Sequence, residues 1–264
     1  MLASSLKQKI RQGGECFGVF MTFDFWPGHL EIMKRQGVDF VVLDMEHGQV
    51  ELPKAEELCR TARLLDLPLL IRPQSCAMDP IKRSLDLGAG GLMVPWMETQ
   101  EQLDTLRAAA FCPPRGRHGM GGPVIMTTGG ATPDDWAKVE ESLAILCQIE
   151  SPAGIEFAPV IASQPWVDSL MVGPYDLAHN MGLLAEYMKA PAHIAAIERI
   201  GRMARDHGKA AGMVVGTGEQ TREWFDKGFQ LVICGCVMGH FAQGLSRNLA
   251  AARRRAAGQN ATPA

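Results

Sequence analysis

The chain has 264 residues, of which 47% are hydrophobic and 21% charged, a globular balance with enough apolar material for a large core. Its formal charge of −3 argues against nucleic-acid binding, and no apolar run approaches the roughly 18 residues of a membrane span. The polar N-terminus lacks a signal-peptide apolar region, and the seven cysteines form no C-x-x-C pair. We therefore expect a cytoplasmic protein with reduced thiols, no zinc site and no membrane or nucleic-acid partner.

Eight short apolar runs alternate with longer amphipathic stretches. Each run is continuously apolar, as expected of parallel strands that are buried on both faces. The predicted strands cover residues 16–22, 39–44, 68–72, 90–95, 143–150, 168–173, 210–215 and 230–235. Eight βα units in a chain of this length favour an α/β fold with a single (β/α)8 TIM barrel over an open doubly wound sheet. We expect one domain over 1–264, with terminal extensions at about 1–12 and 256–264.

Helix patterns fill most gaps between these strands, and several begin near a proline and end at a glycine. The predicted helices cover residues 26–37, 53–66, 79–88, 98–111, 190–208 and 217–228, and the tail after residue 246 also has a basic helical pattern. Residues 111–142 break the rhythm, because they are rich in glycine and proline and too long for a simple connection. Loops of this length inside a compact domain are commonly functional.

Polar side chains follow four of the predicted strands. In a barrel the carboxyl ends of the strands line the active site, so these side chains are expected to converge there. They are Asp44, Glu46 and His47 after the second strand, Arg72 after the third, Gln148 and Glu150 after the fifth, and Asp176 after the sixth, which is reached through Gly173 and Pro174.

Glu150 and Asp176 follow adjacent strands, which places their carboxylates roughly 5 Å apart. Carboxylates that close repel each other unless a proton or a cation lies between them. With no Cys or His ligand pattern nearby, a hard cation such as Mg²⁺ or Mn²⁺, completed by water, is the natural hypothesis. The alternative is that Asp176 caps a helix and Glu150 pairs with a surface cation; spacing alone does not decide between them.

Arg72 and His47 each have a functional and a structural interpretation. An arginine in a barrel mouth suits bidentate binding of a substrate carboxylate, and an ion pair with a neighbouring strand-end acid explains it equally well. His47 would act as a general base if Asp44 accepted its other ring N–H and fixed the tautomer. A lone histidine is more often structural, so the hypothesis depends on the pair.

Lysines and nucleotide motifs give negative results. None of the nine lysines falls within a predicted strand or at its carboxyl end, which disfavours a Schiff-base mechanism. There is no G-x-G-x-x-G after the first strand and no P-loop, so a nucleotide cofactor is not expected.

Five motifs resemble a known family in their order along the chain: "DFVVLDMEHG", "IRP" followed by "DPIKRSLDLGAGGLMVPWMET", "PPRGRHGMGG", "QIESPAGIE" and "VGPYDLAHNMG". Together they look like the metal-dependent class II pyruvate aldolases, the 4-hydroxy-2-oxoheptanedioate and 2-dehydro-3-deoxyglucarate aldolases. The resemblance extends from about residue 16 to about residue 240. It implies a barrel whose C-terminal helix is exchanged between neighbouring subunits, typically in a homohexamer.

The resemblance also implies a reaction. A 4-hydroxy-2-oxo acid would be cleaved reversibly to pyruvate and an aldehyde, through a pyruvate enolate stabilised by one divalent cation per subunit, Mg²⁺, Mn²⁺ or Co²⁺. Glu150 and Asp176 match the metal ligands, Arg72 the pyruvate-binding arginine, and Asp44 with His47 the acid–base pair. Gln148 matches the glutamine beside the site, Glu46 a carboxylate around the metal-bound water, and Asp86 an aspartate offered across the subunit interface to the neighbour's site. The other residues expected to contact the substrate are Ser151, Gly173, Pro174 and Tyr175.

The chain departs from the family pattern where substrate choice would be made. His118, Met120 and the insertion at 121–135 are unusual after "PPRG", as are Tyr175 and His179. These departures leave the pyruvate chemistry intact and the acceptor aldehyde open. A lyase for acyl-CoA or another oxo acid, a phosphate-binding isomerase and a non-catalytic barrel protein are the alternatives. The last is expected to have lost at least one residue of the set Arg72, Glu150 and Asp176, all of which are present.

Overall fold

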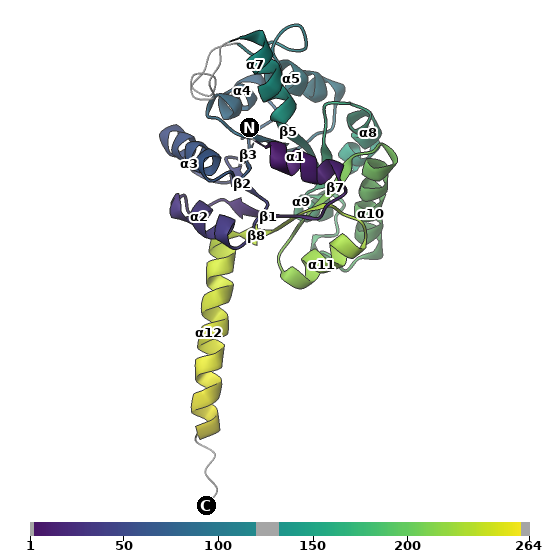
Figure 1. Cartoon of the computed structure of the whole chain (residues 1–264). Helices are drawn as coiled ribbons and strands as arrows, with labels where there is room; N and C mark the ends of the chain where they lie inside the picture. Colours follow the sequence, from purple (N-terminus) through teal and green to yellow (C-terminus); the bar gives the residue numbers. More distant parts are fainter. Residues whose placement is uncertain (1–2, 120–131, 260–264) are drawn as a thin grey trace, which may run out of the picture.

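The computed structural model describes residues 3–119 and 132–259 and contains a closed barrel of eight parallel strands in sequential order (Figure 1). This confirms the predicted (β/α)8 barrel, and each predicted strand is present with its bounds shifted by one residue at most at either end. The strands are β1 (Cys16–Met21), β2 (Phe40–Asp44), β3 (Leu69–Arg72), β4 (Gly91–Val94), β5 (Ala144–Ile149), β6 (Ser169–Val172), β7 (Ala210–Val215) and β8 (Leu231–Cys236).

Two apolar layers explain why the strands are continuous hydrophobic runs. On β2, Phe40 and Val42 belong to the cluster inside the barrel, whereas Val41 and Leu43 pack outward against helices. Both faces of the strand are therefore buried, and alternate residues serve alternate layers. The carboxyl end of each strand is left as the place where polar side chains reach the barrel mouth.

The six predicted helices are confirmed: α2 (Gly28–Arg35), α3 (Leu52–Leu64), α4 (Met78–Asp86), α5 (Gln100–Ala110), α10 (Pro191–Asp206) and α11 (Gly218–Asp226). Helices that the patterns did not bound are α1 (Ser4–Arg11), α7 (Pro133–Ser142), α8 (Pro152–Ala162), α9 (Pro174–Asn180) and the short 3₁₀ helix η1 (Leu184–Glu186).

Two of these helices show why the patterns missed them. In α8, Pro159 lies inside the helix and Pro152 at its start, so the sequence reads as a loop although Ile155, Ala158 and Ile161 are buried. Helix α1 lies in the predicted N-terminal extension and has only one buried residue, Leu6, which joins the cluster inside the barrel. A single apolar anchor gives too little periodicity to recognise.

Helix α12 (Val237–Gln259) follows β8 directly and projects away from the barrel (Figure 1). It begins ten residues before the predicted basic tail. Within the described residues, no helix combines the length and apolar character that crossing a bilayer needs.

Candidate active site

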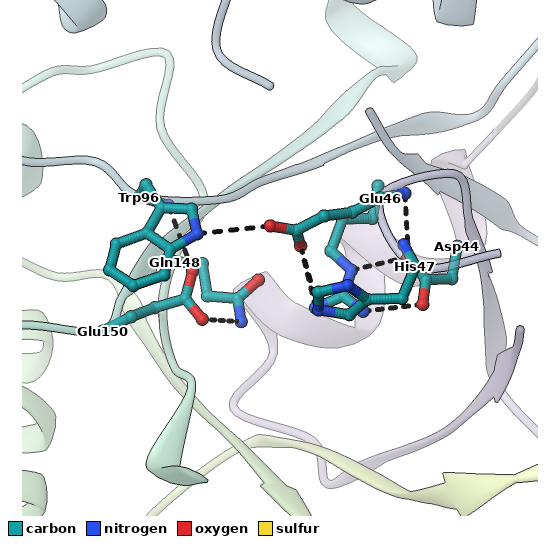
Figure 2. A network of polar contacts seen from close by, with 7 residues as sticks. Asp44, Glu46, His47, Trp96, Gln148 and Glu150 are labelled. Atoms are coloured by element: carbon teal, nitrogen blue, oxygen red, sulfur yellow. Dashed lines mark hydrogen bonds and ion pairs between the residues drawn. The ribbon is translucent and has the colours of Figure 1, made fainter. Parts of the chain in front are cut away.

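The carboxyl ends of β2 to β5 bring a network of polar side chains together (Figure 2). Asp44, Glu46 and His47 lie on one side of it, and Gln148 and Glu150 on the other. Trp96, which sequence reasoning did not single out, lies beside Gln148 and Glu150 and directs its indole N–H toward Glu46. The network therefore unites residues that are up to about a hundred positions apart in the chain.

Arg72 forms the centre of the first group. Its Nε and Nη2 atoms donate to the two carboxylate oxygens of Asp44 at 2.9 and 2.7 Å, and its Nη1 lies 3.2 Å from Glu46. Strand register explains the pair, because Arg72 is directly opposite Asp44 in the β2–β3 ladder. Burial opposes ionisation of Asp44, but the hydrogen bonds and charge of Arg72 outweigh it and lower the pKa of that carboxyl.

The predicted side-chain contact between Asp44 and the His47 ring is wrong. Asp44 accepts the backbone N–H of His47 at 3.2 Å, and both its oxygens are engaged by Arg72. The ring Nε2 of His47 instead lies 3.9 Å from a Glu46 oxygen. The His47 side chain is 59% exposed, which leaves it accessible at the mouth. A general base at this position would therefore have Glu46, and not Asp44, as its neighbouring carboxylate.

Trp96 connects the two groups of carboxylates. Its indole Nε1–H donates to Oε1 of Glu46 at 3.2 Å, and its backbone N–H donates to Oε1 of Glu150 at 3.1 Å (Figure 2). The residue has a φ of 56°, in the left-handed region that side chains other than glycine rarely adopt. The only sequence signal is its place two residues after β4, at the carboxyl end of a barrel strand.

Glu150 is buried among like charges. Burial raises its pKa to about 8 and outweighs the hydrogen bond from the Trp96 backbone N–H, which lowers it. The carboxylates of Glu46 and Asp176 add to the increase, and the charge of Arg72 opposes it. Burial is also the main reason why the pKa of Glu46 is raised, although Arg72 and His47 oppose it. An ionised Glu150 is thus incompletely compensated by the protein groups around it.

Gln148 and Gly173 shape the space beside Glu150. Gln148 Nε2 donates to Oε2 of Glu150 at 2.7 Å, while its own Oε1 is buried and finds no hydrogen-bond partner among the described residues. Gly173 follows β6, and a Cβ there would overlap Oε2 of Glu150 and lie 2.7 Å from Nε2 of Gln148. Only a residue without a side chain allows this close approach.

Helix α9 carries the remaining predicted acid. Its first turn contains buried Pro174, exposed Tyr175 and half-buried Asp176. The amide of Asn180 donates to the backbone oxygens of Glu150 and Asp176 at 3.1 and 2.8 Å, which fixes the helix against the end of β5. Sequence reasoning missed Asn180, since its partner carbonyl lies 30 residues away.

A family model described as HpcH/HpaI aldolase/citrate lyase matches residues 20–243. The chain belongs to this family. Membership confirms the resemblance to the class II pyruvate aldolases and makes the protein a carbon–carbon lyase of the aldolase type. The match includes every residue of the network in Figure 2.

Named relatives agree with this assignment. A protein named hydroxypyruvate/pyruvate aldolase from Delftia acidovorans is 31% identical over 99% of this chain and 97% of its own length. A 4-hydroxy-2-oxovalerate aldolase from Novosphingobium aromaticivorans is 30% identical over 97% of each chain. Among solved structures, an HpcH/HpaI aldolase/citrate lyase family protein from Burkholderia cenocepacia superposes with a TM-score of 0.87 at 26% identity and covers 95% of this chain and 100% of that one.

Aldolases and lyases of this family generally use a divalent metal ion, and the residues present fit one. In the described part of the chain, no three His, Cys, Asp or Glu side chains come together as a ready ligand set. Glu150 and Asp176 nevertheless interact electrostatically, and Gln148, which donates to Glu150 through Nε2, has a buried Oε1 without a partner among the described residues. Two carboxylates with open positions for water and substrate suit a hard cation better than a closed, structural metal site.

Two predicted residues lie apart from the network. The Ser151 hydroxyl caps α8 by accepting from the Gly154 N–H at 3.0 Å and also donates to Glu98, so a contact with substrate stays a prediction. Asp86 ends α4, at the amino-terminal end of the barrel, 3.4 Å from Nε2 of buried His118. It cannot join the network of its own barrel. The unusual Met120 and most of the 121–135 insertion lie outside the described residues.

Proposed function

We propose that this protein catalyses the reversible cleavage of a 4-hydroxy-2-oxo acid to pyruvate and an aldehyde, with one divalent cation per subunit held by Glu150 and Asp176. The observation that carries the proposal is the buried Glu150 carboxylate among like charges at the mouth of an aldolase-family barrel. Such a group needs either a proton or a cation. Mg²⁺, Mn²⁺ and Co²⁺ are the proposed candidates, because all three accept oxygen ligands and open coordination.

When bound, the cation supplies positive charge that favours the enolate formed as the C3–C4 bond breaks. Arg72 assists from the other side of the mouth: two of its nitrogens hold Asp44, and Nη1 lies 3.2 Å from Glu46. Its fixed position is what a pyruvate carboxylate would require of an arginine. Gln148 and Gly173 pack against Glu150, which keeps that carboxylate in one orientation, and Pro174 follows them at the start of α9 as a proposed substrate contact.

His47 is the proposed base that removes the proton from the 4-hydroxyl. Its ring is exposed at the mouth, and its Nε2 lies 3.9 Å from a carboxylate oxygen of Glu46. Asp44 acts indirectly by accepting the backbone N–H groups of Glu46 and His47, which holds the chain that carries both side chains. Tyr175 and Ser151 are further proposed substrate contacts. Tyr175 directly precedes Asp176 in the sequence, and Ser151 directly follows Glu150.

The relatives support pyruvate as the common component of the reaction. One is named for hydroxypyruvate and pyruvate and the other for 4-hydroxy-2-oxovalerate, which is itself a 4-hydroxy-2-oxo acid. The metal ligands proposed here are present in a chain that covers 97% of the length of each of these relatives. A non-catalytic role is therefore disfavoured.

We also propose a homo-oligomer, a hexamer in which α12 is exchanged between subunits. The helix carries exposed apolar side chains on successive turns, Met238, Phe241, Leu245 and Leu249, which is unfavourable for a helix in water. A neighbouring barrel would cover this stripe, and the same contact would offer Asp86 to the neighbour's mouth. Light scattering after size exclusion tests it: Phe241→Glu with Leu245→Glu should yield smaller species than the unchanged chain.

The decisive experiment is coupled detection of pyruvate with a panel of 4-hydroxy-2-oxo acids. We expect turnover with Mg²⁺, Mn²⁺ or Co²⁺ and its loss with EDTA, followed by recovery when the cation is restored. Borohydride provides the control, because it traps Schiff bases and should not inactivate a metal-dependent enzyme. EDTA-resistant turnover together with borohydride inactivation would refute the metal mechanism, and no pyruvate from any substrate would refute the reaction.

A further inference from the structure

Trp96 is held in one place by both of its N–H groups. The backbone N–H donates to Glu150 and the indole N–H donates to Glu46, so neither group is free for a ligand (Figure 2). The residue is nevertheless 37% exposed. With both N–H groups engaged, what the side chain can offer a ligand is the apolar surface of the indole ring. A rigid aromatic surface of this kind suits packing against an apolar part of a substrate.

Other connections at the mouth present aromatic surface as well. Tyr175 precedes Asp176 in the first turn of α9 and is 59% exposed. Phe23 lies in the connection after β1 and is 68% exposed. That connection approaches the one that carries His47, since a Cβ on Gly48 would lie 2.5 Å from the Thr22 backbone oxygen. Exposed aromatic residues thus follow three strands, β1, β4 and β6, at the carboxyl-terminal end of the barrel.

The balance of charge at the mouth also favours an uncharged ligand. The connections after the strands, residues 22–27, 45–51, 73–77, 95–99, 150–151, 173 and 216–217, all lie in the described part of the chain and contain no Lys or Arg. Within the described residues, the network holds three carboxylates, Asp44, Glu46 and Glu150, and Asp176 adds a fourth beside Glu150, against the single guanidinium of Arg72. A divalent cation would still leave one net negative charge, before any substrate carboxylate is added. A second anionic group on the acceptor would be repelled.

We propose that the acceptor aldehyde of this enzyme is uncharged and carries an apolar group, and that Trp96 is the residue that selects it. The inference rests on the proposed pyruvate aldolase function and names its second substrate class. The indole surface packs against the apolar group, while Glu46 and Glu150, which Trp96 holds, disfavour an anionic one. Trp96 is thus a specificity-determining residue and takes no part in the bond-breaking step.

The test is aldol synthesis from pyruvate with two matched four-carbon aldehydes: butanal, and succinic semialdehyde, in which a carboxylate replaces the terminal methyl group. We expect kcat/KM for butanal to exceed that for succinic semialdehyde by at least about 10-fold. Trp96→Lys removes the apolar surface and adds a cation, so it should reverse the preference. Trp96→Phe keeps an aromatic surface and should retain the preference, with a higher KM for butanal.

Trp166→Phe is the matched control, because Trp166 packs against Phe111 outside the mouth and should leave the ratio unchanged. If Trp96 had only a structural role, Trp96→Lys would lower kcat/KM for both aldehydes by the same factor, and that result would overturn the inference. Equal or better use of succinic semialdehyde by the unchanged enzyme would overturn it as well, although the aldolase function would stand. Absence of product with every aldehyde, and of pyruvate release in the cleavage direction, would overturn both.

Discussion

The two sides of the barrel mouth differ in how their charges are balanced. On the β2–β3 side, Asp44 meets Arg72 through two hydrogen bonds, and the pKa of Asp44 is lowered. On the β5–β6 side, Asp176 repels the charge of Glu150, no ion pair of Glu150 with a Lys or Arg is found among the described residues, and burial raises the pKa of Glu150 to about 8. The first side is complete within the protein. The negative charge of the second side is balanced only when a cation binds there. Substitutions on the second side should therefore reduce cation binding and turnover, whereas substitutions on the first should reduce stability.

The largest expected effect is on the β5–β6 side. Glu150→Gln keeps the size of the side chain and removes its charge, so pyruvate release should fall by about 10³-fold as the cation site is lost. Calorimetric titration should show much weaker binding of Mn²⁺, while the thermal unfolding temperature of the metal-free protein stays near that of the unchanged chain. Glu156→Gln, on the exposed surface of α8, is the control. Unaltered Mn²⁺ affinity in Glu150→Gln would remove the basis of the comparison.

The β2–β3 side should respond in stability. Asp44→Asn leaves Arg72 buried without its ionic partner, which should lower the free energy of unfolding by about 3 kcal/mol at pH 7. Because the folded-state pKa of Asp44 is lowered, its contribution is present above the ordinary aspartate pKa and is lost as the pH falls through the folded-state value. The difference between the two proteins should therefore narrow in acid.

Urea unfolding at a series of pH values measures this difference. Asp226→Asn provides the contrast, since its ion pair with Arg222 is on the surface and should contribute nothing measurable at any pH. A constant difference between Asp44→Asn and the unchanged chain across the pH series would mean that packing, and not the ion pair, determines the loss.

The same contrast separates what the sequence could predict from what it could not. Barrel strands have a local signature, because both faces of each strand are apolar, and their ends located Asp44, Arg72 and Glu150 at the mouth. Which side chains touch is a matter of register and of long-range packing. The β2–β3 register pairs Asp44 with Arg72, and the ring of His47 lies beside Glu46. Proximity along the chain instead predicts a contact between Asp44 and the His47 ring.

Trp96 shows the limit most clearly. Its indole reaches Glu46, which is 50 residues away in sequence, and its backbone reaches Glu150, which is 54 away. No periodicity or spacing encodes such contacts, and a tryptophan near an apolar strand is normally assigned to the core. Helix α8 was hidden for the opposite reason, a local one: Pro159 contradicts a helix that tertiary burial of Ile155 and Ile161 nevertheless stabilises.

His47 lies on the balanced side and yet should affect turnover more than stability. Its ring is exposed, so His47→Ala should leave folding almost unchanged and reduce kcat for pyruvate release by about 10²-fold. Mn²⁺ binding measured by calorimetry should be retained, which distinguishes this variant from Glu150→Gln. His207→Ala, with an exposed ring bonded to its own helix, is the control. Full turnover by His47→Ala would show that another group removes the hydroxyl proton.

The smallest effect should come from Gly173, an uncharged residue that packs against Glu150 on the β5–β6 side. Gly173→Ala places a Cβ against Oε2 of Glu150 and Nε2 of Gln148, so one of these side chains must move. Since both are buried, we expect Mn²⁺ affinity and pyruvate release to fall by about 10-fold each, with a loss of about 1 kcal/mol in unfolding free energy. Gly218→Ala, where a Cβ meets open space at the start of α11, should be neutral in both assays. If Gly173→Ala lowered stability alone, the carboxylate of Glu150 would tolerate displacement, and its position would matter less to the site than its charge.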